Sequence, residues 1–478
     1  MKRILMCAFA LIFMGICAHA QQAKYIFLFI GDGMAMPQIS SAEVYAGALA
    51  GSDVDIKKLT FTRFPNAGIM TTYDAGSFIT DSASAGTAMA SGYKTLSGII
   101  NMDPAKRVKY TPITYDMKKK GYKIGIISSV SLDHATPASF YAAVESRGDM
   151  YNIAVQLAKS GFDYFAGGGF VKEKGKDGQP DIYSVFKDNG YKVVNSNADF
   201  KKLKGSKLIM INEKLQDAKS MSYEVDRKAD DLSLAEHTKK AIEILDNSKG
   251  FFLMVEGGKI DWACHANDAA AAIHDVISLD KAVQEAVAFY NKHPNDTVII
   301  VTGDHETGGM TLGFAGTQYA TFFDKVASQK GSFIRFNDEI LTPYKKSAAA
   351  GGLLSDLDSQ IKNYFGFAVS ELSSDEQAQV QLAFKRSMGG ELENTTDQML
   401  FLLFGGYEPL TVKLTQIMNQ RAGIGWTSYA HTGVPIPVFA IGKGGQHFTG
   451  YYDNTDIYKY LAALAGVETA GKKVALSR

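Results

Sequence analysis

Acidic and histidine side chains follow directly after three apolar runs of the chain. Such short, continuous apolar runs are typical of strands buried on both faces of a sheet. In open α/β sheets, ligands bind beyond the carboxyl ends of the strands, so side chains at three such ends are expected to converge on one site. The residues concerned are Asp32 after the run 25–30, Glu256, Asp261 and His265 after 251–255, and Asp304 and His305 after 298–301.

The types and spacing of these residues suit metal ions. Asp261 and His265 are four residues apart, so on a helical turn they share a face and can hold one ion. Asp304 and His305 are adjacent, with glycines on both sides that let the backbone turn both side chains to one place. Mixed carboxylate and imidazole ligands suit zinc. Singly, each residue would more often be a surface acid or a helix cap. The oxygen ligands that would suit magnesium are Asp32 and Glu256.

A second group of residues, 80–88, is rich in serine and alanine. The small residues after Ser82 favour a closely packed helix that begins at this serine. A helix N-terminus offers free backbone N–H groups and partial positive charge, which favour a phosphate and a serine alkoxide. By composition alone such a helix start is more often plain packing. A neighbouring metal cluster makes Ser82 a candidate nucleophile, because zinc can activate a serine without a histidine base.

The elements that must position these residues alternate along the chain. Further apolar runs occur at 123–127 and 437–441, and helical patterns occur at 234–245 and 269–290. This alternation predicts an α/β fold with a mostly parallel central sheet and helices on both faces.

One region departs from this alternation. Residues from about 313 to 426 lack strong strand runs and carry helix-like stretches at 353–364 and 375–387. We interpret this region as a largely helical insertion within one catalytic domain that spans residues 21–478.

The first twenty residues differ in composition from the rest. Lys2 and Arg3 precede an apolar run from Ile4 to Ile16, and Ala18-His19-Ala20 offers small residues where a signal peptidase cleaves. This pattern predicts a signal peptide over residues 1–20, hence a secreted protein of the periplasm. No other stretch is long and apolar enough for a membrane anchor.

Charge and cysteine content narrow the function further. Fifty basic residues balance fifty acidic ones, so no basic surface for nucleic acid or lipid is indicated. A bound anion must therefore be held by local chemistry. Cys7 and Cys17 lie in the expected signal peptide, which leaves Cys264 without a disulfide partner. Stability is then expected from a large core, bound metals or oligomerisation.

Several of these motifs together resemble those of the alkaline phosphatase family. Asp81-Ser82-Ala83 is similar to the family's nucleophile motif, and the matches run in family order from Asp32 to His431. The resemblance implies that Ser82 is transiently phosphorylated while phosphate monoesters are hydrolysed. It also implies that Arg147, eleven residues after Thr136, clamps the phosphate. A homodimer is the assembly that the resemblance suggests.

By the same resemblance the protein binds two zinc ions and one magnesium ion. Compact members of the family carry an aspartate and a lysine where this chain has His134 and Trp262. These two residues are therefore expected to contact the substrate side of the site, and the magnesium site is expected to hold its ion weakly. The implied ligands are Asp261, His265 and His431 for the first site, Asp32, Asp304 and His305 for the second, and Asp32, Thr136 and Glu256 for the third, which takes magnesium.

Other functions on such a metal scaffold remain open. A phosphodiesterase needs room for a second ester group, in the space where Arg147 places a charge. A sulfatase needs a cysteine or serine in its own modification motif, which is not found around Ser82. A phosphoglycerate mutase and a non-catalytic phosphate- or metal-binding protein are further alternatives. The residues expected to have only packing or surface roles are His237, His274, His293, His447 and Cys264.

Overall fold

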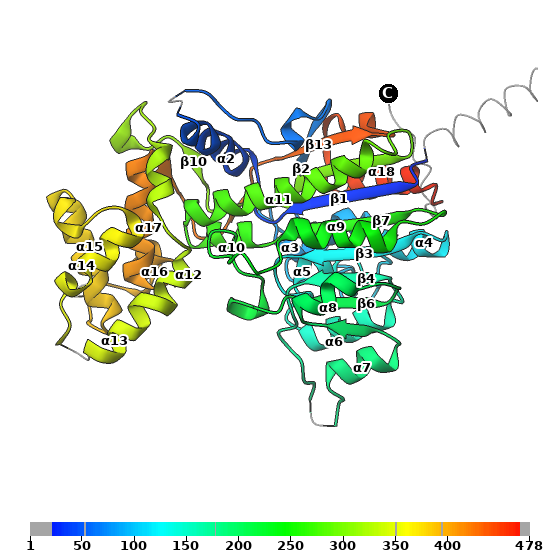
Figure 1. Cartoon of the computed structure of the whole chain (residues 1–478), viewed down its shortest axis with the longest axis horizontal. Helices are drawn as coiled ribbons and strands as arrows, with labels where there is room; N and C mark the ends of the chain where they lie inside the picture. Colours follow the sequence, from blue (N-terminus) through cyan, green and yellow to red (C-terminus); the bar gives the residue numbers. More distant parts are fainter. Residues whose placement is uncertain (1–21, 52–53, 177, 349–350, 393–394, 469–478) are drawn as a thin grey trace, which may run out of the picture.

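A ten-stranded sheet forms the centre of the protein (Figure 1). The computed structural model describes residues 22–51, 54–176, 178–348, 351–392 and 395–468, so the expected signal peptide lies outside the described residues. Across the sheet the strands are β14 (Gly450–Asp453), β2 (Asn66–Thr71), β13 (Ile436–Gly442), β8 (Thr297–Gly303), β1 (Tyr25–Gly31), β7 (Phe251–Gly257), β3 (Lys123–Ser128), β4 (Tyr164–Gly167), β6 (Leu208–Ile211) and β5 (Lys192–Val194).

The prediction of a mostly parallel sheet is confirmed. Neighbouring strands run parallel throughout, except where β13 pairs antiparallel with β2 and with β8. The five expected strands correspond to β1, β3, β7, β8 and β13. The other five strands were not predicted. Four of them have only three or four residues, and β2, although six residues long, is buried only at alternate positions and so shows no continuous apolar run.

Helices cover both faces of the sheet, as expected. Alternate side chains of β1 enter two separate cores: Tyr25, Phe27 and Phe29 pack with α2, α9 and α11, whereas Ile26, Leu28 and Ile30 pack with α3, α4, α6, α7 and α18. Every residue of β1 is buried, which explains its continuous apolar sequence. The helices are α2 (Met36–Leu49), α3 (Ser82–Ser91), α4 (Ile113–Lys119), α5 (Ala135–Ala138), α6 (Met150–Lys159), α7 (Ile182–Asp188), α8 (Asn197–Lys202), α9 (Leu234–Leu245), α10 (Lys259–His265), α11 (Ala269–Tyr290) and α18 (Thr455–Ala465).

The described residues between 313 and 426 are mostly helical and gather at one end of the molecule, yellow-green to orange in Figure 1. The stretch expected at 353–364 begins with a 3₁₀ turn, Leu354–Leu357, before its α-helix starts. Apolar side chains of this segment form a core of their own. Its helices are α12 (Phe333–Phe336), α13 (Thr342–Ala348), α14 (Asp358–Phe365), α15 (Ser374–Ser387), α16 (Asp397–Phe404) and α17 (Pro409–Ala422).

The two ends of this helical segment meet at a short ribbon. Strand β10 (Thr311–Leu312) pairs antiparallel with β11 (Ile424–Gly425), so the chain leaves and re-enters the sheet domain at one place. Of the helices in the described ranges, none combines the length and the hydrophobicity that crossing a bilayer requires.

Candidate active site

Three carboxylates meet at the carboxyl end of the central strands. Strand β1 lies between β7 and β8, and Gly31 is paired with both Gly257 and Gly303, so the three strands end at one level. The side chains there are fully buried. The carboxylates that this register brings together are Asp32, Glu256 and Asp304.

Gly33, in the loop after β1, allows this loop to lie close to Asp261 on α10 and to Thr307 after β8. Its φ is +71°, and a Cβ at this position would lie 2.9 Å from Cα of Asp261 and 2.8 Å from Oγ1 of Thr307. A side chain at this position would therefore force the loops apart.

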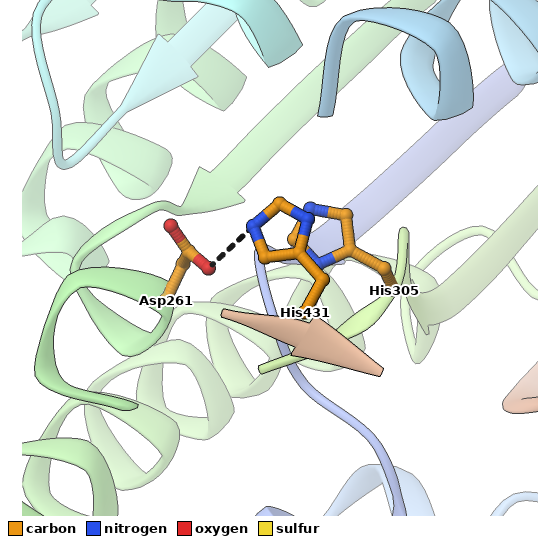
Figure 2. Close-up of side chains that lie close together, drawn as sticks. All are labelled: Asp261, His305 and His431. Carbon is orange, nitrogen blue, oxygen red and sulfur yellow. Dashed lines mark ion pairs between the residues drawn. The ribbon is translucent and has the colours of Figure 1, made fainter. Parts of the chain in front are cut away.

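A second ribbon brings His431 back to the site. Strand β9 (Glu306–Thr307) pairs antiparallel with β12 (His431–Thr432), so the two histidines on either side of the helical segment become neighbours. The rings of His305 and His431 stack with their centroids 3.6 Å apart, and Figure 2 shows them beside the carboxylate of Asp261.

The candidate ligands of the first site lie within contact distance of one another. Nε2 of His265 is 3.4 Å from Oδ1 of Asp261 and 3.2 Å from Nε2 of His431, which is itself 3.6 Å from Asp261. Nδ1 of His265 faces the carbonyl of Tyr429 at 2.5 Å, and Nδ1 of His431 faces the carbonyl of Thr80 at 2.8 Å. If each Nδ1 carries the proton, both Nε2 atoms present lone pairs to the same point, as metal-binding histidines do.

The second site adjoins the candidate nucleophile. Nε2 of His305 lies 3.4 Å from Oδ1 of Asp32 and 3.4 Å from Oδ2 of Asp304. The hydroxyl oxygen of Ser82 is 3.2 Å from the same nitrogen. An ion held by these three side chains would therefore lie next to the serine oxygen.

The third site contains an imidazole beside its expected oxygen ligands. Thr136 donates its hydroxyl to Oδ2 of Asp32 at 3.4 Å, and Ser128 donates to Glu256. A ring nitrogen of His134 also lies within 4.8 Å of carboxylate oxygens of Asp32 and Glu256. The side chain expected to face the substrate thus borders this metal site as well.

The electrostatics of the carboxylates favour bound cations. Burial raises the pKa of Asp304 to about 8 and that of Glu256 to about 7, and the Asp261 carboxylate adds to both shifts. Burial and Asp304 raise the pKa of Asp32 well above its ordinary value. One oxygen of each carboxylate accepts no hydrogen bond from the described residues. Buried acceptors without donors are costly, and metal ions would satisfy them.

Asp261 differs from these carboxylates because imidazoles surround it. Burial alone would raise its pKa, but His265 and His431 hold it well below the ordinary value. For His265 burial acts in the opposite direction and would lower the pKa, yet the Asp261 carboxylate raises it to about 9. Thr307, which the sequence did not single out, donates to Oδ1 of Asp261 at 2.5 Å and lies 3.3 Å from Nδ1 of His305. It thus connects the first site to the second.

Ser82 and Arg147 are both positioned by Asp81. This aspartate caps α3, whose first residue is Ser82, by accepting the N–H of Ser84 at 2.9 Å. Its other oxygen accepts from Nη1 of Arg147 at 2.9 Å, while Nη2 of Arg147 is 3.2 Å from Nε2 of His134. Asp81 was quoted in the Asp81-Ser82-Ala83 motif but was not predicted as a site residue. Its link to Arg147 could not be read from the sequence, because the two residues are far apart along the chain.

A pocket of about 530 Å³ opens above the first site. Trp262 forms part of its wall and meets the ring of His134 edge-on, with the centroids 5.7 Å apart. The carboxylates Asp32, Glu256 and Asp304 of the second and third sites do not line the pocket. Of the predicted site residues, those that line the pocket are Ser82, His134, Arg147, Asp261, Trp262, His265 and His431.

The side chains expected to have packing roles stay outside the metal clusters of the described chain. Nε2 of His237 faces the side-chain oxygen of Asn212 at 2.7 Å, and His274 contacts the hydroxyl of Tyr45. Cys264 is fully buried, as expected of a small residue on α10.

An α/β sheet that places buried carboxylates and imidazoles below a serine and an arginine defines a metal-dependent hydrolase. A family model described as alkaline phosphatase matches residues 23–467. The chain therefore belongs to the alkaline phosphatase family, enzymes that hydrolyse phosphate monoesters.

Several relatives extend over most of the chain. Alkaline phosphatase 4 of Bacillus subtilis (strain 168) is 31% identical over 447 residues, which cover 91% of this chain and 87% of that protein. The crystal structure of a cold-active alkaline phosphatase from Shewanella sp. is 27% identical with a TM-score of 0.75, covering 93% of this chain and 100% of that one. A histidine-to-aspartate mutant of the alkaline phosphatase from the Antarctic bacterium TAB5, solved with magnesium in its M3 site, is 25% identical with a TM-score of 0.64, covering 94% and 100%.

Proposed function

We propose that this enzyme hydrolyses phosphate monoesters through a phosphoserine at Ser82, with two zinc ions and one magnesium ion in the three sites. The observation that carries the proposal is the position of the Ser82 hydroxyl. It begins a capped helix, lies 3.2 Å from Nε2 of His305, and borders a pocket that Arg147 also lines.

The chain's own residues supply the binding and the nucleophile. Arg147 binds two non-bridging phosphate oxygens as a planar fork. Oγ of Ser82 gives up its proton to water and attacks phosphorus, the bond from phosphorus to the leaving oxygen breaks, and the leaving alkoxide takes up a proton from water. Water then attacks phosphorus, the bond from phosphorus to Oγ breaks, Oγ takes up a proton of the attacking water, and inorganic phosphate is released. Zinc bound here would supply Lewis acidity that lowers the pKa of hydroxyl groups and offsets charge on phosphoryl oxygens.

The donor sets support these metals. The first and second sites mix carboxylates with imidazoles, which suits zinc. The third site offers oxygens of Asp32, Thr136 and Glu256, which suit magnesium, with the nitrogen of His134 nearby. Magnesium in the M3 site of the TAB5 mutant supports magnesium as a cofactor on this fold.

The test of the proposed intermediate is acid trapping of phosphoserine. Metal-loaded parent enzyme incubated with labelled phosphate at low pH should carry label on the peptide that contains Ser82, and Ser82→Ala should carry none. Ser84→Ala is the matched control, because Ser84 lies on the same helix but bonds with the hydroxyl of Thr80 and the carboxylate of Asp81. Label that persists in Ser82→Ala would contradict the proposal.

Acid trapping, together with a comparison of monoester and diester hydrolysis rates, separates the alternative functions. A non-catalytic phosphate- or metal-binding protein would show no label and no turnover. A phosphodiesterase would hydrolyse bis-aryl phosphate faster than the corresponding monoester. We expect the monoester to be much faster, because the positive charge of Arg147 lies where a second ester group would have to fit.

We also propose two further features of the enzyme. Residues 1–20 have the pattern of a signal peptide, so we propose export to the periplasm. We also propose a homodimer, supported by large apolar side chains exposed along the sheet edge and the loop before Ser82. These side chains are Ile69, Tyr73, Phe78, Ile79 and Tyr451.

A further inference from the structure

Part of the pocket lining comes from residues outside the candidate metal sites. We name it the outer wall and define it as Asp217, Phe333, Asn337, Tyr407 and Glu408, all of which line the pocket. Asp217 belongs to the 3₁₀ turn Asp217–Lys219, and the other four belong to the helical segment. Since Ser82 and Arg147 occupy the phosphate side, the outer wall faces the group that leaves.

Asp217 is held rigidly with one oxygen free. A fully buried lysine, Lys259, donates to its Oδ1 at 2.6 Å, and Ser220 donates to the same oxygen at 3.2 Å. The ammonium of Lys259 also lies 4.9 Å from the ring centroid of Trp262. The side chain of Asp217 is 27% exposed, and Oδ2 accepts no hydrogen bond from the described residues. Asp217 thus offers a fixed acceptor whose negative charge Lys259 already offsets.

Glu408 offers a second acceptor of the same kind. It precedes the first residue of α17, and its Oε2 pairs with Nζ of Lys345 at 3.1 Å. Its Oε1 is covered by neighbouring atoms yet accepts no hydrogen bond within the described ranges. Because Oε1 is covered, the atom of this carboxylate left to accept from a ligand is Oε2, beside the Lys345 ammonium.

Asn337 and two aromatic rings complete the outer wall. Oδ1 of Asn337 accepts the hydroxyl of Thr411, which leaves its amide N–H groups as donors for a ligand. The rings of Phe333 and Tyr407 meet edge to face with centroids 5.7 Å apart. Apolar ring surface beside fixed acceptors and a donor matches a group that presents C–H faces and several hydroxyls.

We propose that the outer wall is a leaving-group subsite for polyhydroxy alcohols, so that sugar phosphates are the preferred substrates. An ammonium-bearing leaving group fits less well, because both carboxylates already have lysine partners and leave little net negative charge. A plain alkyl group would leave the acceptors without donors. This inference rests on the proposed function, since the subsite adds selectivity to the same reaction.

The test compares three phosphate esters on the metal-loaded enzyme. Glucose 6-phosphate carries the hydroxyls, cyclohexylmethyl phosphate has a similar ring without them, and choline phosphate carries a cation. We expect kcat/KM for glucose 6-phosphate to exceed that for the other two by about tenfold, which corresponds to one good hydrogen bond. Parent values within twofold of one another, or the highest value with choline phosphate, would overturn the inference.

Two variants locate the selectivity. Glu408→Ala and Asn337→Ala should each lower kcat/KM for glucose 6-phosphate about fivefold and leave cyclohexylmethyl phosphate within twofold. Lys345→Ala breaks the same ion pair as Glu408→Ala but keeps the carboxylate. It should therefore retain the preference for glucose 6-phosphate and raise kcat/KM for choline phosphate. Glu391→Ala, an exposed carboxylate of the same segment outside the pocket, is the neutral control.

The outcome for the subsite is separable from that for the reaction itself. Equal losses on all three esters in Glu408→Ala and Asn337→Ala would refute the subsite while leaving monoester hydrolysis intact. No phosphate release by the parent from any ester, together with no label on Ser82, would refute the proposed function instead.

Discussion

The contact between Asp81 and Arg147 predicts how tightly the enzyme holds phosphate. Arg147 is 31% exposed, and its only ion pair in the described chain is to Asp81, which is 17% exposed. Removing the guanidinium in Arg147→Ala should cost about 2 kcal/mol of phosphate binding, the lower end for a charge-assisted bidentate pair, because the site is partly open to water. The inhibition constant for inorganic phosphate should therefore rise roughly 30-fold.

Asp81→Asn should weaken phosphate binding less than Arg147→Ala does. The effect should arise because Arg147 loses its ion-pair partner. The ion pair restricts a long side chain, and releasing it should cost about 1 kcal/mol of binding, or roughly fivefold. Asparagine caps helices about as well as aspartate, so α3 should still begin at Ser82 and the melting temperature should change little. Asp116→Asn, which removes a surface pair with Lys119, is the matched control and should change neither quantity.

A double-mutant cycle tests whether Asp81 acts by positioning Arg147. The assay is competitive inhibition of aryl phosphate hydrolysis by inorganic phosphate, with all variants at saturating zinc and magnesium. Adding Asp81→Asn to Arg147→Ala should produce no further loss, so the coupling energy should be about 1 kcal/mol. The reasoning is refuted if Asp81→Asn raises the inhibition constant fivefold in both backgrounds, since Asp81 would then act independently of the arginine.

Three further predictions concern the metals and the assembly. His134→Asp should retain magnesium through dialysis better than the parent, because magnesium prefers carboxylate oxygen to imidazole nitrogen; equal metal content in both would contradict this. Chelated protein should become less stable to heat as the pH rises from 7 to 9. In the folded state Asp304 and His265 have pKa values of about 8 and about 9, so they hold protons that the unfolded chain has already released. The free energy of unfolding therefore falls as the pH rises through these values, by at most about 1.4 kcal/mol per proton and pH unit. An equal melting temperature of chelated protein at pH 7 and pH 9 would contradict this prediction. Metal-loaded protein, measured at the same two pH values, is the control. Phe78, 88% exposed, should contribute to the dimer, so Phe78→Glu should shift the mass measured by light scattering from dimer to monomer, and an unchanged dimer would exclude this face.

Sequence patterns predicted that the residues after the strand ends lie together, for a physical reason. Continuous apolar runs mark strands buried on both faces, and parallel strands end at one edge, so Asp32, Glu256 and Asp304 were expected together. The spacing of Asp261 and His265 likewise follows from one helical turn. These relations depend only on local periodicity and the general geometry of parallel sheets.

Long-range pairings were beyond the reach of such patterns. The ribbon β9–β12, which brings His431 beside His305, consists of two residue pairs and has no hydrophobic period to reveal it. The resemblance to a family was needed to include His431. The roles of Asp81 and Thr307 depend on hydrogen bonds between side chains distant in sequence, and local patterns carry no information about those bonds.

Asp32 links the third site to the nucleophile. Its Oδ1 lies 3.4 Å from Nε2 of His305, the nitrogen that contacts the Ser82 hydroxyl, while its Oδ2 accepts from Thr136 in the third site. One carboxylate therefore divides its two oxygens between two candidate metal sites. An ion in the third site would draw electron density from Asp32 and weaken it as a donor to the second site, next to the serine. Since His134 adds an imidazole rather than a carboxylate there, the composition of the third site should tune the reactivity of Ser82 without any contact between His134 and the serine.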